Sequence, residues 1–243
     1  LSQLPFQVQE FPYIGSVTKD YPISSYVLHQ ENNFSFCSYK RPQENEKVSN
    51  IEVNDLLKKA FHLTPGEVLK FKVTNFHDIE EVQWEVKVNP LNETYLSCSR
   101  SGAIAYFDRD ENQFRFTYFE GSKNCLLYYF FVSCYNVQEG FYQGLVIKDN
   151  YPLSLVYPKK ILWFHDFISP FFRLAKAEYE MEYVSIDDHI SPSEIKLDSS
   201  LRNLFLKKEL NTMKFHTTIS KRGVQSLVVE SKGIITKLER CDD

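Results

Sequence analysis

The chain has 243 residues, a net charge of −4 at pH 7 and 43% hydrophobic residues, which are ordinary values for a soluble globular protein. The sequence has no basic run and no positive excess, so its composition argues against a nucleic-acid-binding protein. The longest apolar run has about ten residues, whereas a transmembrane helix needs roughly 20, so we expect no transmembrane segment in this chain. The 20 Phe and 15 Tyr residues form a surplus that predicts some aromatic side chains on the surface.

The start of the chain and its cysteines give two further expectations. Leu1 is not an initiator Met, so we expect that a protease cut the chain here or that the start was chosen by design, and that no signal peptide remains. The five cysteines include no Cys-x-x-Cys pair, so the usual zinc spacing is absent. We therefore expect no cofactor, while the odd number of cysteines leaves at least one free thiol.

The first elements predicted along the chain are two short strands and a helix. The strands cover residues 26–30 and 34–39 and are joined by a short polar turn. Apolar residues at helical spacing predict a helix within residues 50–63, with Asn50 or Asn54 as its N-cap.

From residue 67 onward, apolar residues alternate with polar ones, which predicts a series of strands. The predicted strands cover residues 69–73, 82–88, 95–99, 103–108, 113–119 and 141–148. Strands separated by turns every 8 to 12 residues are typical of an antiparallel sandwich or barrel. We therefore predict a mainly β protein whose first domain, residues 1–150, is β-sandwich-like.

The apolar run at residues 125–135 is the clearest structural signal in the sequence. Both of its alternating faces are apolar, and it is rich in aromatic residues, which favours an internal strand covered on both sides. In such a strand Cys125 and Cys134 lie on opposite faces, so we expect no disulfide between them.

A second domain is predicted over residues 151–243, after a turn-like boundary at residues 149–152. It is expected to be a smaller α+β unit with a half-exposed strand at residues 177–183. A helix is predicted at residues 201–210, capped by Asp198 or Ser199. The chain is then expected to end in a three-strand meander at residues 213–220, 225–230 and 234–239.

Weak candidates for catalytic chemistry lie near the predicted boundary. His165 and Asp166 follow an apolar segment, and Asp187, Asp188 and His189 lie in a predicted loop. Histidine and carboxylate side chains are the ligands and bases of a hydrolytic metal site, but short combinations of them are frequent by chance. The alternative is a solvated acidic loop, in which replacing all three loop residues with Ala would change the free energy of unfolding by less than roughly 1 kcal/mol.

The sequence offers two other kinds of candidate site, and each has an ordinary structural alternative. Cys134 with His165 and Asp166 has the residue types of a cysteine nucleophile, yet its apolar neighbours predict an inert thiol. Trp84, Tyr179 and Tyr183 are candidate ligand-binding aromatics, and each has the alternative of being an ordinary core residue.

Two functional hypotheses from different classes remain. The first is a non-catalytic binding or scaffold protein, extracytoplasmic or secreted, that recognises a protein or glycan partner. It rests on the absence of a catalytic motif, the number of strands and the aromatic surplus. The second is a hydrolase with a His/Asp site near the domain junction, where ligand sites are frequent. The sequence favours the first, without naming a ligand.

Overall fold

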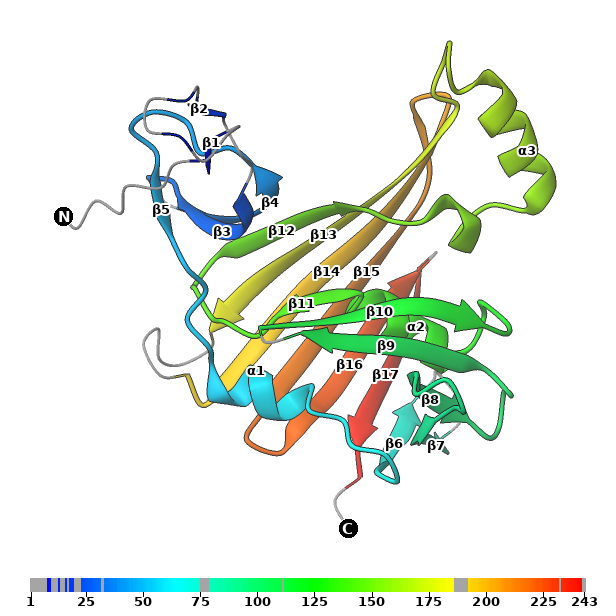
Figure 1. The fold of residues 1–243 in the computed structure, drawn as a ribbon. Helices are drawn as coiled ribbons and strands as arrows, with labels where there is room; N and C mark the ends of the chain where they lie inside the picture. Colours follow the sequence, from blue (N-terminus) through cyan, green and yellow to red (C-terminus); the bar gives the residue numbers. More distant parts are fainter. Residues whose placement is uncertain are drawn as a thin grey trace.

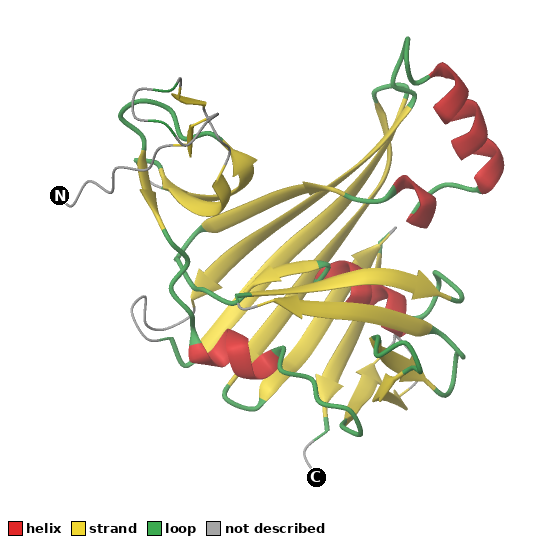
Figure 2. Cartoon of the chain, viewed as in Figure 1, coloured by secondary structure: helices red, strands yellow, loops and turns green. Residues whose placement is uncertain are grey.

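The computed structural model describes residues 8–9, 13, 16, 18–19, 23–31, 33–74, 79–110, 112–185, 192–231 and 233–241. Its strands are β1 (Val8–Gln9), β2 (Thr18–Lys19), β3 (Ile23–His29), β4 (Phe34–Lys40), β5 (Lys47–Ser49), β6 (Val68–Thr74), β7 (Ile79–Val88), β8 (Thr94–Cys98), β9 (Ile104–Asp110), β10 (Gln113–Glu120), β11 (Asn136–Gln138), β12 (Leu145–Asn150), β13 (Ala175–Ser185), β14 (Glu194–Phe205), β15 (Lys208–Ser220), β16 (Gly223–Ser231) and β17 (Ile234–Arg240). Its helices are α1 (Asp55–Ala60), α2 (Leu126–Ser133), α3 (Lys159–Ile168) and the short 3-10 helix η1 (Leu153–Leu155). The protein is mainly β, as predicted (Figures 1 and 2).

Fifteen of the described strands form one sheet. Its strand order is β11-β10-β9-β8-β7-β6-β17-β16-β15-β14-β13-β12-β4-β3-β5. The sheet is antiparallel apart from the pairing of β12 with β4, which is parallel. The two short strands β1 and β2 pair only with each other among the described residues. The architecture is thus one large and mostly antiparallel sheet, and a sandwich-like N-terminal part stays a prediction.

The large sheet curves around α2, so that β9 and β10 lie on one side of this helix and β14 and β15 on the other (Figure 1). Register shifts between Phe116 and Tyr118 in β10, and between Thr218 and Ile219 in β15, mark irregularities of the β-bulge kind. Bulges bend and twist a strand, which helps a wide sheet to fold over. The main hydrophobic core lies between the two sides and includes most of α2.

The apolar run at residues 125–135 forms helix α2, so the predicted internal strand is wrong. Phe130 and Phe131 are buried, and the ring centroid of Phe130 lies 5.1 Å from that of Trp84 on one side of the helix. A helix satisfies its own backbone hydrogen bonds, whereas a strand in this place would need a neighbour along each edge. The segment is apolar all round because it is enclosed on most sides.

The predicted helix at residues 201–210 is also wrong, because β14, a turn and the start of β15 occupy this region. Ile195, Leu197 and Leu201 are buried and lie at even spacings, which is the period of a strand. The strand pairs along its length with β13 and β15, and these long-range hydrogen bonds override a local pattern that suits a helix.

Other elements agree with the sequence. The predicted helix is present as α1, although shorter than the range predicted. Its N-cap is Asn54, whose Oδ1 accepts hydrogen bonds from the backbone N of Leu56 at 3.0 Å and of Leu57 at 3.2 Å. The half-exposed strand at residues 177–183 lies within β13, and β15, β16 and β17 form the predicted meander.

The predicted boundary at residues 149–152 coincides with the end of β12. Strands on either side of it pair directly, since β12 pairs with β13 and β17 pairs with β6. One core cluster also contains residues from both parts. The division into residues 1–150 and 151–243 stays a prediction.

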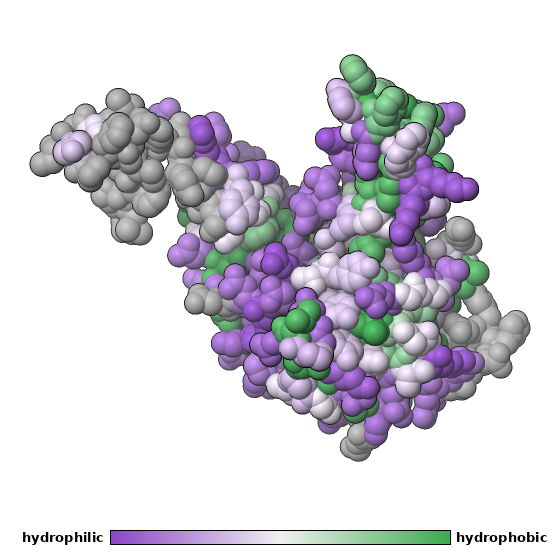
Figure 3. All heavy atoms as spheres, turned by 45° about the vertical axis from the view of Figure 1, so that its right-hand side comes forward, coloured by the Kyte–Doolittle hydropathy of each residue, from purple (hydrophilic) through white to green (hydrophobic). Residues whose placement is uncertain are grey.

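Helix α3 lies at one end of the long strands, away from α1 and α2 (Figure 1). Figure 3 shows hydrophobic side chains gathered on the projecting part of the molecule at this end. None of the helices in the described part of the chain is long and apolar enough to cross a membrane.

Candidate functional site

The aromatic residues proposed as ligand-binding are core residues, which corrects their expected exposure. Trp84, Tyr179 and Tyr183 are fully buried. The hydroxyl of Tyr179 donates a hydrogen bond to the backbone O of Ser133 at 2.9 Å, and Tyr183 bonds in the same way to Gln138 at 3.0 Å. Tyr179 and Tyr183 thereby link α2 and β11 to β13. Because all three aromatic side chains are buried, none of their faces is available for a ligand to stack on.

Of the proposed His and Asp residues, the structure describes only His165 and Asp166. His165 is buried on α3, and its Nδ1 lies 3.3 Å from Oδ1 of its exposed neighbour Asp166. Asp187, Asp188 and His189 lie outside the described residues. Among the described residues no group of three His, Cys, Asp or Glu side chains could hold a metal ion. A His/Asp hydrolase site therefore stays a prediction.

The environment of Cys134 is the apolar one that the sequence suggests. It is completely buried, and burial raises the pKa of its thiol to about 12, so the thiolate is scarce at neutral pH. Its Sγ lies 3.5 Å from the hydroxyl of Ser133 and 4.0 Å from the hydroxyl of Thr217. All five cysteines are free thiols, including Cys125 and Cys134. On a helix these two also point in opposite directions, because nine residues span two and a half turns.

A cleft of about 1000 Å³ lies between β4, β12 and the strands β9 to β11. Residues 35–40 of β4 and residues 146–149 of β12 line it without interruption. Successive side chains of a strand point to opposite faces of the sheet, so an uninterrupted run of lining residues means that the cleft follows the edge of each strand.

The cleft opens where two parallel strands separate. β12 pairs with β4 at Leu145 opposite Phe34 and at Val146 opposite Ser35, and the described residues show no further pair between these strands. Beyond this point β4 remains paired with β3, and β12 with β13. Each strand therefore keeps one partner and turns its other edge towards the cleft.

Two amide residues of the opposite wall, Gln113 and Asn136, belong to a hydrogen-bond network. Oδ1 of Asn136, at the start of β11, accepts hydrogen bonds from Nε2 of Gln113 at 2.7 Å and of Gln138 at 3.1 Å. Its Nδ2 donates to the Asp149 carboxylate of β12 at 3.5 Å. This network connects β10, β11 and β12, and it places polar groups of both hydrogen-bonding kinds at the cleft.

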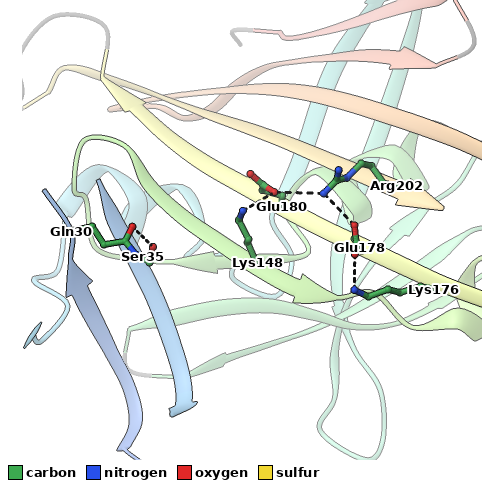
Figure 4. Close-up of polar contacts among 7 residues, drawn as sticks. All are labelled: Gln30, Ser35, Lys148, Lys176, Glu178, Glu180 and Arg202. Atoms are coloured by element: carbon green, nitrogen blue, oxygen red, sulfur yellow. Dashed lines mark hydrogen bonds and ion pairs between the residues drawn. The ribbon is translucent and has the colours of Figure 1, made fainter. Parts of the chain in front are cut away.

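The charges around the cleft are mixed in sign and partly paired. Arg115 and Asp108 form an ion pair at 3.3 Å on the β9–β10 side. On the β12 side, Lys148 lies 3.4 Å from Glu180, which begins a row of alternating charges across β13 and β14 (Figure 4). The row continues through Arg202, Glu178 and Lys176. The row contains three cations and two carboxylates, so the charges beside the cleft nearly balance.

Tyr39 is a strained residue at the outer end of the cleft. Its φ of 51° lies in the left-handed region, which bulky residues rarely adopt, and its side chain is 76% exposed. Such strain costs about 1–3 kcal/mol and is found most often at binding and active sites. The lining of the cleft thus includes an exposed aromatic ring.

The comparisons with known proteins identify no relative. No protein-family model matches the chain, no curated protein is similar to it in sequence, and no solved structure is similar to it in fold. The sequence pattern missed this cleft, because its lining segments at residues 35–40, 108–116 and 146–149 are far apart in the chain.

Proposed function

We propose that the protein is a non-catalytic binding protein whose cleft accepts an extended peptide segment of a partner. The observation that carries this proposal is the separation of β4 and β12 after two residue pairs, with both strand edges facing a cleft of about 1000 Å³. Unpaired strand edges bind extended peptides through backbone hydrogen bonds, and nearby side chains select among sequences.

The backbone of β4 is oriented for this role. Gln30 N donates to Asn33 O at 2.9 Å, which makes these two residues a hydrogen-bonded pair of the β3–β4 hairpin. Hydrogen-bonded and non-hydrogen-bonded pairs alternate along an antiparallel ladder, so Phe36 and Ser38 occupy non-hydrogen-bonded positions towards β3. Their N–H and C=O groups therefore point to the other side of β4, where the cleft lies.

The size and polarity of the cleft indicate the length and polarity of the peptide that it would bind. Four to six residues of strand edge line it, which corresponds to a peptide segment of about 13–20 Å in extended form. Its charged lining residues are four cations and three carboxylates, and six of the other fourteen are Ser, Gln or Asn. A polar peptide fits this lining better than an apolar one, and the ring of Tyr39 offers one apolar contact.

A glycan could use the same hydroxyl and amide groups, but it would not explain two facing strand edges. Export of the protein is a further proposal, which rests on the sequence alone.

Chemical modification of the peptide backbone tests whether the ligand binds as an extended peptide. Peptides selected from a random library on the folded protein would be resynthesised with single N-methyl groups along the chain. Because alternate peptide N–H groups would point to one strand edge, we expect N-methylation to weaken binding with a period of two residues. Uniform tolerance of N-methylation, or selection of glycans but no peptides, would contradict the proposal.

A pair of variants locates the binding site. Ser38→Trp places a bulky side chain in the cleft and is expected to abolish peptide binding. Thr117→Trp puts the same side chain on an exposed strand position outside the cleft lining and should leave the dissociation constant unchanged. Equal effects of the two variants would show that the peptide binds elsewhere.

A further inference from the structure

Helix α3 presents its aromatic face to solvent. Trp163 and Phe167 are each 72% exposed and stack on each other, with ring centroids 6.2 Å apart. Phe164 lies on the same side of the helix and is exposed, whereas His165 on the opposite side is buried. A surface helix of a globular protein normally turns its apolar face towards the core, so this orientation is reversed.

The aromatic surface continues beyond the helix. Phe171, after the end of α3, is 91% exposed, and Phe172 beside it is also exposed. The backbone N of Leu206 donates to O of Leu174 at 2.8 Å, which brings the exposed turn between β14 and β15 next to this segment. Together these residues form an apolar tip on the projecting end of the molecule (Figure 3). We define the apolar tip as Trp163, Phe164, Phe167, Phe171, Phe172 and Leu206.

Positive charge surrounds the apolar tip in a protein that is acidic as a whole. The two segments that carry the tip, residues 158–173 and 206–210, contain five of the 28 Lys and Arg residues but only two of the 32 Asp and Glu residues. The five cations are all exposed. They are Lys159, Lys160, Arg173, Lys207 and Lys208. The remainder of the chain therefore carries more negative charge than the net value of −4 indicates.

We propose that the apolar tip docks the protein on a membrane surface that contains anionic lipid. In this arrangement α3 lies along the interface, its aromatic rings enter the boundary between headgroups and acyl chains, and the surrounding cations contact lipid phosphates. Exposed aromatic residues flanked by Lys and Arg are the usual composition of interfacial helices. Anionic lipids attract such basic residues, and the interface favours Trp in particular.

The shape and composition of the tip favour lipid over a protein partner. A projecting tip reaches a flat and deformable surface without needing a matching hollow. Four of the five surrounding cations are Lys, which is depleted from protein–protein interfaces but common in membrane-binding basic patches. None of the tip residues lines the cleft, so the proposal does not depend on the peptide proposal.

Tryptophan fluorescence tests the docking of the tip on a membrane. The chain has two Trp residues, of which Trp84 is buried in the core and Trp163 lies in the tip. Vesicles of phosphatidylcholine with phosphatidylserine should therefore shift the Trp emission of the full chain to shorter wavelength. Lipids brominated on their acyl chains should quench only the exposed Trp163. Vesicles of phosphatidylcholine alone should give a much smaller response.

Variants distinguish tip-dependent binding from other adsorption. The triple variant Trp163→Ser, Phe167→Ser, Phe171→Ser should reduce co-sedimentation with anionic vesicles by about tenfold or more. The matched control Leu91→Ser, Tyr118→Ser removes exposed apolar side chains elsewhere and should bind like the wild type. Circular dichroism and the melting temperature of each variant verify that it is folded.

Charge reversal supplies a second, independent variant. Lys159→Glu with Lys160→Glu leaves every ring in place and should abolish the preference for anionic vesicles. The proposal is overturned if wild type does not bind anionic vesicles, or if the control loses binding as much as the tip variant does. A tip-dependent dimer or protein complex without vesicle binding would also overturn it.

Discussion

Tyr183 and Gln138 exchange two hydrogen bonds across 45 residues of sequence. The backbone N of Gln138 donates to the Tyr183 hydroxyl at 2.7 Å, and that hydroxyl donates to the Gln138 backbone O at 3.0 Å. Both residues are buried, and burial raises the pKa of Tyr183 well above its ordinary value, so the phenol keeps its proton. This pair fastens β11, the last strand of the sheet, to β13 and thereby fixes one wall of the cleft.

Removal of the Tyr183 hydroxyl should destabilise the protein. Tyr183→Phe leaves two buried backbone groups of Gln138 without this partner, and since each such group costs about 1–3 kcal/mol we expect a loss of about 2–4 kcal/mol. Urea unfolding measures the change. Tyr179→Phe is the matched control, because Ser133 O keeps a second donor, the Ser199 hydroxyl at 2.9 Å. An equal loss in both variants would contradict the proposed role of the Gln138 contact.

Phe130 is expected to be a major core residue even though it lies on a helix and not on the predicted strand. Its ring is buried between Trp84 and Phe116, at centroid distances of 5.1 Å and 5.8 Å. Phe130→Ala should cost about 3–5 kcal/mol in unfolding free energy. Leu91→Ala, at an exposed position, should stay within about 0.5 kcal/mol. A loss below 1 kcal/mol at Phe130 would show that the core is looser than the structure indicates.

Glu178 should contribute stability that depends on pH. The hydrogen bond from Lys176, at 2.6 Å, lowers the pKa of its carboxyl, and Arg202 adds to this effect. A lowered pKa in the folded state stabilises the protein above the unfolded pKa of about 4.3, and this contribution disappears as pH falls through the folded value. Glu178→Gln should therefore be less stable than wild type at pH 7 by up to about 1 kcal/mol.

The measurement is the unfolding free energy of wild type and variant between pH 7 and pH 3. The difference between the two should close below about pH 4. Glu182→Gln, on the same face of β13, serves as control and should show no comparable change. A difference that grows on acidification would contradict the sign of this effect.

The thiols should differ in reactivity according to burial. At pH 8 the buried Cys134 thiol stays protonated, because its pKa is raised to about 12. Iodoacetamide should therefore leave Cys134 unmodified in the native protein and modify the partly exposed Cys241. Mass mapping after digestion measures the modification of both cysteines. In urea the two cysteines should be equally reactive. Rapid native labelling of Cys134 would reopen the hypothesis that it is a nucleophile.

The sequence determined the elements whose pattern is local. Alternating residues with tight turns specify the meander of β15 to β17, and Asn54 marks the start of α1 with its side chain. The half-exposed strand within β13 shows its two faces directly in the alternation of Glu with Ala, Tyr and Met. These features depend on neighbours in the chain, so no tertiary information is needed to predict them.

Only the tertiary structure decided the rest, because the deciding contacts join distant residues. The run at residues 125–135 is apolar on both alternating faces, so its period does not by itself separate a strand from a buried helix, and enclosure by the curved sheet selects the helix. Leu201 belongs to a strand because β13 and β15 pair on both sides of it. Burial of Trp84 and exposure of Trp163 also depend on the path of the sheet, because the type of a side chain does not determine which residues pack over it.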